Sequence, residues 1–105
     1  MDDILNKLEQ VLEQRKDASI DESYVASLYD KGLDSILKKI AEESSEVIMA
    51  AKDGEKDKII YEMADLWFHT MVLLRYKDIN IDEIKDALSS RFGLSGLEEK
   101  ASRNK

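Results

Sequence analysis

Residues 33–52, LDSILKKIAEESSEVIMAAK, decide the fold class, because apolar side chains recur in them at the spacing of an α-helix. The positions that share this face are Leu33, Ile36, Leu37, Ile40, Ala41, Ser44, Val47, Ile48 and Ala51. The i, i+3, i+4, i+7 repeat continues without a slip, so we expect one helix about 30 Å long. Asp53 and Gly54 follow directly and are typical of a helix end.

Residues 56–76 predict a second long helix. Its apolar side chains surround nearly the whole helix, as in helices that are buried on every side. Three shorter segments show the same helical spacing: 3–14, 23–28 and 80–93. The polar residues 15–22 are predicted to form a loop. Helices joined by connections of a few residues indicate an all-α antiparallel bundle.

Residues that cap helices precede the shorter segments. Asp2 or Asp3 stands before the first, and Ser23 before the second. Asn80 precedes the last helix and Glu83 follows three residues later, which is the spacing of a capping box. That helix is predicted to bury an apolar stripe formed by Ile81, Ile84 and Leu88.

The composition favours a helical fold and excludes several kinds of catalytic and metal site. The 105 residues are expected to form a single domain, 43% of them hydrophobic and 37% charged, with no proline and four glycines. The absence of cysteine excludes disulfides, thiolate catalysis, iron–sulfur clusters and cysteine-based zinc sites. A single histidine excludes a multi-histidine metal site within one chain.

The charge of the chain disfavours several classes of partner. The net charge is −7, whereas a protein that binds nucleic acid without sequence preference carries a basic face. No apolar run approaches the roughly 20 residues of a membrane span. The first ten residues, MDDILNKLEQ, are acidic and amphipathic, unlike a secretory signal, so we expect a cytoplasmic protein.

Two sets of acids occur on the two long helices. Glu42, Glu43 and Glu46 belong to residues 33–52, and Glu62 and Asp65 belong to residues 56–76. Glu43 and Glu46 fall at the edge of the apolar face, while Glu42 falls further out. Glu62 and Asp65 lie in a narrow stripe with apolar residues on both flanks. An ordinary solvated helix face is the alternative interpretation, and it fits the first set better than the second.

Acids that meet between packed helices need a counter-charge. Two carboxylates about 5 Å apart repel by roughly 3 kcal/mol at an effective dielectric constant of 20. Oxygen ligands without cysteine suit Mg²⁺, or Mn²⁺, which also takes phosphate oxygens of a substrate. A di-iron site would need Glu-x-x-His on two helices, and the chain has only His69. We interpret His69 as a packing or supporting residue rather than a ligand.

The acids also form a family pattern: EExxE at Glu42–Glu46 and ExxD at Glu62–Asp65. This pattern resembles the all-α, MazG-like nucleotide pyrophosphohydrolase superfamily. Ser23–Lys52, Asp65–His69 and the segment RFGLSGLEEKASR at Arg91–Arg103 are similar to one branch, the phosphoribosyl-ATP pyrophosphatase family. The resemblance covers roughly Ser23 to Arg103.

The resemblance implies the reaction: phosphoribosyl-ATP and water give phosphoribosyl-AMP and pyrophosphate, the second step of histidine biosynthesis, with Mg²⁺ required. It also implies a homodimer that completes the bundle, with active sites close to the subunit interface. The domain is often fused to the cyclohydrolase of the next step, and 105 residues leave no room for that partner, so we expect the stand-alone form.

Roles for individual residues follow as hypotheses. Glu43, Glu46, Glu62 and Asp65 would hold Mg²⁺ on the triphosphate, and Glu42 would be a further ligand or would orient the attacking water. The catalytic set is therefore Glu42, Glu43 and Glu46. The candidates for substrate binding, each weighed against an ordinary solvated side chain, are Lys31, Lys38, Lys39, Arg91, Lys100 and Arg103.

Two other functions stay open on the sequence. One is a different pyrophosphohydrolase of the same superfamily, acting on dUTP or noncanonical nucleotides; the segment Arg91–Arg103 argues against it. The other is a non-enzymatic helical dimerisation module with its acids merely exposed. Activity on a panel of substrates tests the first alternative. Thermal melting with and without Mg²⁺ tests the second.

Overall fold

The computed structural model describes residues 3–92. Helices are the only regular secondary structure in that part of the chain. The elements are, in order, α1 Ile4–Gln14, the 3₁₀ turn η1 Arg15–Asp17, α2 Tyr24–Lys31, α3 Leu33–Asp53, α4 Lys56–Tyr76 and α5 Ile81–Ser89. The all-α prediction is therefore confirmed. Within these residues no helix combines the length and the apolar character that crossing a bilayer requires.

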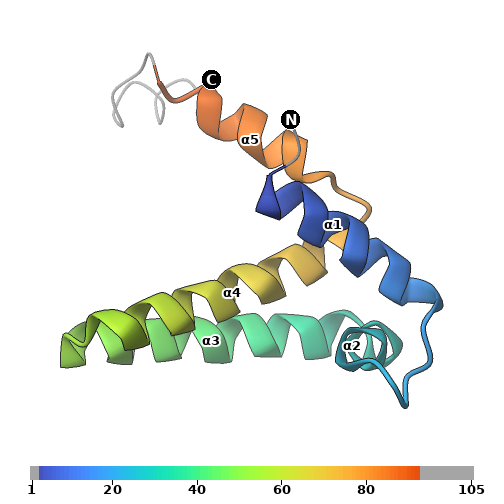
Figure 1. Cartoon of the computed structure of the whole chain (residues 1–105), viewed down its shortest axis with the longest axis horizontal. Helices are drawn as coiled ribbons and strands as arrows, with labels where there is room; N and C mark the ends of the chain where they lie inside the picture. The colour runs from blue at the N-terminus through green and yellow to red at the C-terminus, as the bar shows by residue number, and fades with distance from the viewer. Residues whose placement is uncertain (1–2, 93–105) are drawn as a thin grey trace.

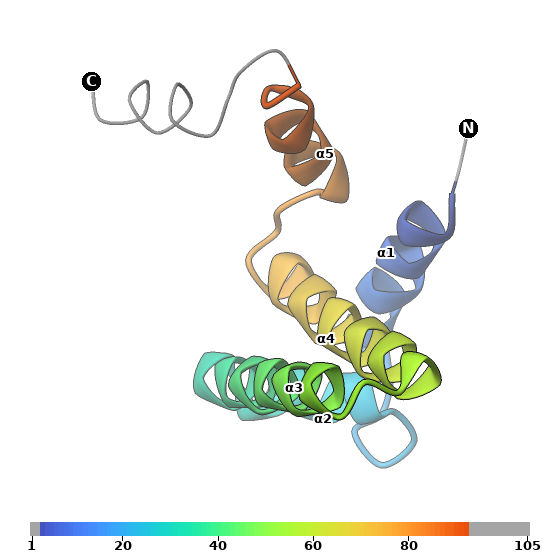
Figure 2. The ribbon, with the colours of Figure 1, turned by 90° about the vertical axis from the view of Figure 1, so that its left-hand side faces the viewer.

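The two long helices form an antiparallel hairpin, α3 beside α4, which is the largest packing interface of the chain (Figures 1 and 2). The connection between them is short because Gly54 ends α3 with a φ of 78°, in the left-handed region that glycine adopts without strain. The helix bounds agree closely with those predicted for residues 33–52 and 56–76. This hairpin fixes which residues of α3 face which residues of α4.

The shorter helices gather at one end of the hairpin. α2 packs against the start of α3, and α1 crosses the end of α4 (Figure 1). α5 returns beside α1, where Lys85 Nζ lies 2.8 Å from Asp3 Oδ2. The predicted caps are confirmed: the Asn6 amide donates to Asp3 Oδ1 at 2.9 Å, the Ala26 amide to Ser23 Oγ at 3.1 Å, and Asn80 with Glu83 forms a capping box.

Three predicted bounds of the shorter segments need correction. Arg15–Asp17 continues the turn of α1 as a 3₁₀ helix instead of opening into a loop. α2 extends to Lys31, because the chain keeps its helical hydrogen bonds until Gly32 adopts a φ of 96°. α5 ends at Ser89, four residues before the predicted end at Gly93.

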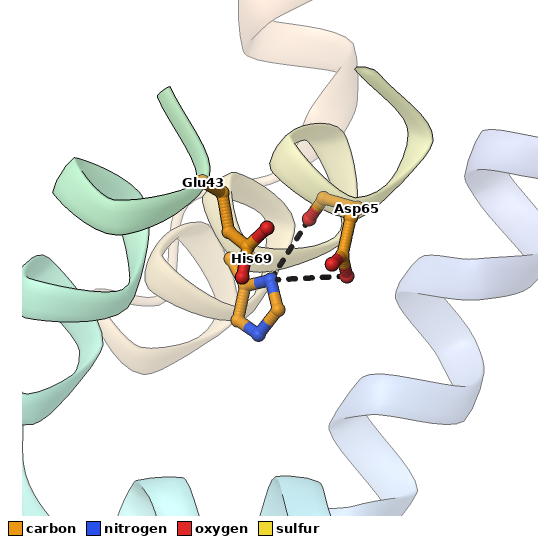
Figure 3. Close-up of side chains that lie close together, drawn as sticks. All are labelled: Glu43, Asp65 and His69. Atoms are coloured by element: carbon orange, nitrogen blue, oxygen red, sulfur yellow. Dashed lines mark hydrogen bonds and ion pairs between the residues drawn. The ribbon is translucent and has the colours of Figure 1, made fainter. Parts of the chain in front are cut away.

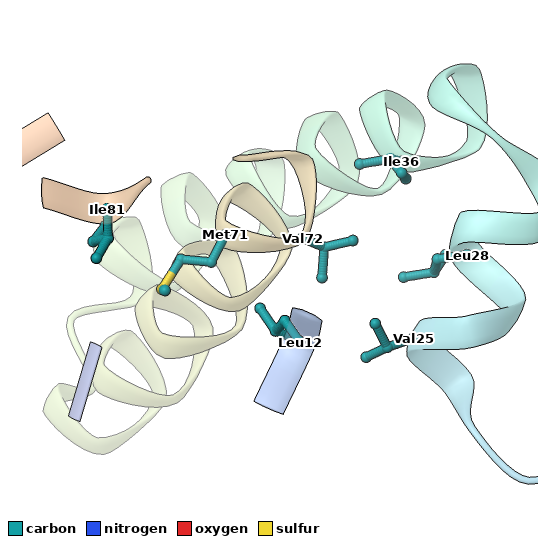
Figure 4. Close-up of a cluster of buried hydrophobic side chains, with 7 residues drawn as sticks. All are labelled: Leu12, Val25, Leu28, Ile36, Met71, Val72 and Ile81. Carbon is teal, nitrogen blue, oxygen red and sulfur yellow. The ribbon is translucent and has the colours of Figure 1, made fainter. Parts of the chain in front are cut away.

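The hydrophobic core lies where the short helices meet the end of the hairpin (Figure 4). Its buried members are Leu12, Val25, Leu28, Ile36, Met71, Val72 and Ile81. They come from all five α-helices. The core therefore fixes α2 and the first turns of α3 against the second half of α4.

Burial of α4 on every side is wrong for the single chain. Ile60, Tyr61 and Trp67 are 56%, 69% and 54% exposed, because among residues 3–92 the main element packed along α4 is α3, which covers one side of it (Figure 1). The predicted stripe of α5 is also mostly wrong. Ile81 is buried, but Ile84 and Leu88 are 37% and 55% exposed, since α5 extends away from the hairpin (Figure 2).

Truncating Ile36 to alanine should destabilise the chain, since this side chain is fully buried in the core. We expect the free energy of unfolding to fall by about 2–5 kcal/mol, because the substitution removes buried methylene groups and leaves a cavity. Urea denaturation followed by circular dichroism measures the loss. The control is Ile20→Ala at an exposed position, and an equal loss in both variants would contradict the assigned core.

Candidate active site

The hairpin brings together acids from both long helices. One carboxylate oxygen each of Glu43, Glu46 and Glu62 lies within 4.8 Å of the others. A second group, within the same distance, is formed by oxygens of Glu43 and Asp65 and a ring nitrogen of His69 (Figure 3). Glu43 belongs to both groups. We call Glu43, Glu46, Glu62 and Asp65 the acid cluster; these are the four acids predicted to meet, and their role as ligands stays a prediction.

Glu43 is the most constrained member of the acid cluster. This residue of α3 is only 5% exposed, and its Oε2 atom has no hydrogen-bond partner among residues 3–92. Burial raises the pKa of the Glu43 carboxyl, and the nearby Asp65 carboxylate raises it further. Lys39 opposes these effects, with its Nζ atom 3.3 Å from Glu43 Oε1. The net result is a carboxyl that holds its proton more tightly than usual.

Glu62, which comes from α4, also has a raised pKa caused by a neighbouring acid and by burial. The neighbouring Glu46 carboxylate is the main cause of the raised pKa of Glu62, followed by burial. Its Oε2 atom is buried and also lacks a hydrogen-bond partner in the described part of the chain. Two buried carboxylate oxygens that have no partner within residues 3–92 and lie close to further acids fit a hard divalent cation such as Mg²⁺ or Mn²⁺. The residues present therefore suit the metal that the sequence analysis expected.

Both ring nitrogens of His69 are engaged by protein groups. Nδ1 lies 2.8 Å from the backbone oxygen of Asp65, and Nε2 lies 2.8 Å from the hydroxyl of Tyr24. A carbonyl oxygen only accepts, so Nδ1 is the donor; in the neutral ring Nε2 then accepts from Tyr24. His69 is 3% exposed and packs edge-on against Phe68. These contacts agree with the interpretation of His69 as a supporting residue.

A groove of about 260 Å³ lies beside the acid cluster at the start of α3. We call it the lysine groove; its lining residues are Tyr24, Leu28, Lys31, Ser35, Lys38, Lys39 and Glu42. Lys39 joins the two features, because its Nζ atom contacts Glu42 at 3.6 Å as well as Glu43. Three lysines therefore line a hollow next to four carboxylates, an arrangement suited to a phosphorylated ligand with its cation.

The remaining predicted site residues lie elsewhere. Glu42 is exposed on the lysine groove and belongs to neither group of converging acids. Arg91 follows the end of α5, a helix that packs on α1 and lies apart from α3 (Figure 2). Lys100 and Arg103 lie outside the described residues. Sequence reasoning missed Tyr24 altogether, because only the tertiary structure places its hydroxyl against His69.

The fold and the site together define a class: an all-α protein whose helical hairpin carries an acid cluster beside a groove lined by three lysines. Comparison with known proteins narrows this class. Residues 5–92 match the family described as "Phosphoribosyl-ATP pyrophosphohydrolase". The chain belongs to this family, and the resemblance seen in the sequence is confirmed.

Individual relatives align with this chain over nearly their whole length. The chain is 74% identical to the phosphoribosyl-ATP pyrophosphatase of Ruthia magnifica subsp. Calyptogena magnifica over 104 residues, 99% of each chain. It is 60% identical to the protein of the same name from Methylococcus capsulatus (strain ATCC 33009 / NCIMB 11132 / Bath), over 96% of each chain. Identity to that of Neisseria gonorrhoeae (strain ATCC 700825 / FA 1090) is 53%, over 97% of this chain and 95% of the relative.

Replacing Glu43 with glutamine should stabilise the metal-free protein at neutral pH. The pKa of Glu43 is raised above its ordinary 4.5 in the folded state, so the folded chain binds this proton more tightly than the unfolded chain does. Wild-type stability should therefore fall as the pH rises from about 4.5 through the raised pKa, and the variant should lack this part of the loss.

Urea denaturation with a chelator present, at several pH values, measures this effect. The exposed Glu42→Gln is the matched control and should change the free energy of unfolding little. Below about pH 4 the advantage of Glu43→Gln should vanish, because the wild-type carboxyl is protonated in both states. A variant less stable than wild type at neutral pH would show that Glu43 is not under electrostatic strain.

Proposed function

We propose that this chain hydrolyses phosphoribosyl-ATP to phosphoribosyl-AMP and pyrophosphate, the second step of histidine biosynthesis. The observation that carries this function is the match to the phosphoribosyl-ATP pyrophosphohydrolase family over residues 5–92, with relatives of that name aligned along nearly the whole chain. The acid cluster supports the function from the structural side, because it supplies oxygen ligands at one place. A cytoplasmic location follows from this proposal.

Mg²⁺ is the proposed cofactor, with Mn²⁺ as an alternative. Glu43, Glu46, Glu62 and Asp65 would hold it, which would give partners to the two buried oxygens that lack them. When bound, the metal would offset the charge of the triphosphate and of the pyrophosphate that leaves. The cation would also offset the repulsion between acids, which adds to burial in raising the pKa of Glu43 and is the main cause of the raised pKa of Glu62.

The lysine groove supplies the other half of the proposed site. Lys39 would contact phosphate oxygens close to the acid cluster, since Glu43 holds its ammonium group there. Glu42 lies beside Lys39 without joining the acid cluster, so we propose that it orients the attacking water. The other proposed substrate-binding residues are Lys31, Arg91, Lys100 and Arg103.

A homodimer is the proposed assembly. Large apolar side chains of α3 and α4 are exposed in the single chain: Leu37, Ile48, Met49, Ile60, Tyr61, Met63 and Trp67. Exposed apolar area of this extent on a helical hairpin is typical of a protein–protein interface. A second copy packed there would give α4 the cover that its sequence pattern predicts. It would also lie on the hairpin that carries the acid cluster.

Pyrophosphate release from phosphoribosyl-ATP tests the function directly. Wild type should turn over only with Mg²⁺ or Mn²⁺, and Glu43→Gln and Glu62→Gln should each lower kcat/KM by about 10- to 100-fold or more, because each removes a proposed ligand. Part of the loss should return at high Mg²⁺. The exposed Glu55→Gln should keep normal activity.

Three results would contradict the proposal. Normal turnover of Glu43→Gln would rule out the metal-binding role of the acid cluster. Full activity with a chelator present would rule out the requirement for a metal. Release of pyrophosphate from dUTP but not from phosphoribosyl-ATP would assign the chain to another substrate. A true metal site should also raise the melting temperature of the wild type in Mg²⁺.

Sedimentation equilibrium tests the dimer. Wild type should sediment as a dimer, and Trp67→Glu should shift the protein to monomers, because it places a charge on the proposed apolar interface. Phe92→Glu, at a site 88% exposed beyond α5, is the control and should remain dimeric. A wild type that stays monomeric at high concentration would rule out this assembly.

A further inference from the structure

The outer part of the lysine groove carries the positive charges of Lys31 and Lys38. Among residues 3–92, neither Lys31 nor Lys38 has a carboxylate within ion-pair distance, whereas Lys39 pairs with Glu42 and Glu43. The whole chain carries a net charge of −7, so acids are abundant and the lack of partners here is notable. Glu42, the acid among the residues that line the groove, pairs with Lys39, so the charges of Lys31 and Lys38 favour an anionic ligand.

The groove extends away from the acid cluster along α3. Lys39 lies at the inner end of the groove, with its Nζ atom 3.3 Å from Glu43 Oε1. Lys31 and Ser35 lie at the outer end. Glu43 follows Leu33, the first residue of α3, by ten positions, which corresponds to about 15 Å along the helix axis. A ligand with phosphate groups at two separated points can therefore contact both the acid cluster and the outer end of the groove.

One residue that lines the groove, Tyr24, is held in place by the fold. Tyr24 lines the groove, and its hydroxyl lies 2.8 Å from Nε2 of the buried His69. Tyr24 is nevertheless 52% exposed as a residue, so part of it is accessible to a ligand. A side chain already held by a buried partner loses little conformational entropy when a ligand binds.

We propose that Lys31, Ser35 and Lys38 bind the terminal phosphate of the phosphoribosyl group, while the acid cluster and Lys39 bind the triphosphate. This inference rests on the proposed function, because it assigns the second phosphate of that same substrate. Two ammonium groups and a hydroxyl offer a phosphate dianion several charge-assisted hydrogen bonds. The lysine groove then distinguishes phosphoribosyl-ATP from ATP, which carries the same triphosphate but no second phosphate.

The double variant Lys31→Gln/Lys38→Gln tests the assignment. KM for phosphoribosyl-ATP should rise about tenfold or more, since charge-assisted hydrogen bonds to the substrate are lost, while kcat stays within about twofold. Competitive inhibition by ATP should be unchanged. The control Lys52→Gln/Lys56→Gln removes the same charge at the other end of the hairpin and should leave both constants unaltered.

Two outcomes would overturn the assignment. An unchanged KM in the groove variant shows that the two lysines do not contact the substrate, and an equal weakening of ATP inhibition shows that they serve the triphosphate instead. An increase in KM of the control variant equal to that of the groove variant also overturns it, because overall charge then explains the effect.

A binding measurement separates this inference from the proposed function. Ribose 5-phosphate at millimolar concentration, without Mg²⁺, should shift the NMR amide signals of Lys31, Ser35 and Lys38 in wild type and not in the groove variant. These shifts in a protein that fails to hydrolyse phosphoribosyl-ATP would refute the proposed function and leave a phosphate-binding groove. Turnover without these shifts would refute the groove assignment alone.

Discussion

Electrostatic repulsion between carboxylates at the α3–α4 interface is the constraint on which the rest of the site depends. Glu43 is buried among Glu46, Glu62 and Asp65, and burial together with the neighbouring acids raises its pKa. A packed interface normally excludes such groups, because desolvation penalises the charged form. The hairpin therefore keeps a locally unfavourable arrangement, as functional sites often do.

The energy that maintains this arrangement comes from elsewhere in the chain. The core lies at one end of the hairpin, where all five α-helices contribute buried apolar side chains. Buried Arg75 of α4 connects α1 to the segment before α5. It donates to Glu13 Oε1 at 2.8 Å and to the backbone oxygen of Ile79 at 2.6 Å. α3 and α4 are thus fixed at one end, and the acids lie further along the hairpin.

The acid cluster and the lysine groove form one continuous feature of opposite charges. Lys39 contacts Glu43, and Tyr24 reaches across from α2 to His69, which in turn holds the backbone of Asp65. These contacts connect three helices around the proposed substrate. The cation side and the phosphate side of the site are therefore positioned by the same packing of α2 on α3 and α4.

The sequence by itself determined the helices, the two sets of acids and the family, because helical periodicity, capping residues and short motifs are local properties that can be read from the spacing of residues. Only the tertiary structure decided that Tyr24 binds His69, that Lys31 shares a groove with Lys39, and that α4 and α5 leave apolar faces open. These features depend on the angles at which helices pack. Those angles arise from contacts between residues far apart in the chain, which spacing along one helix does not encode.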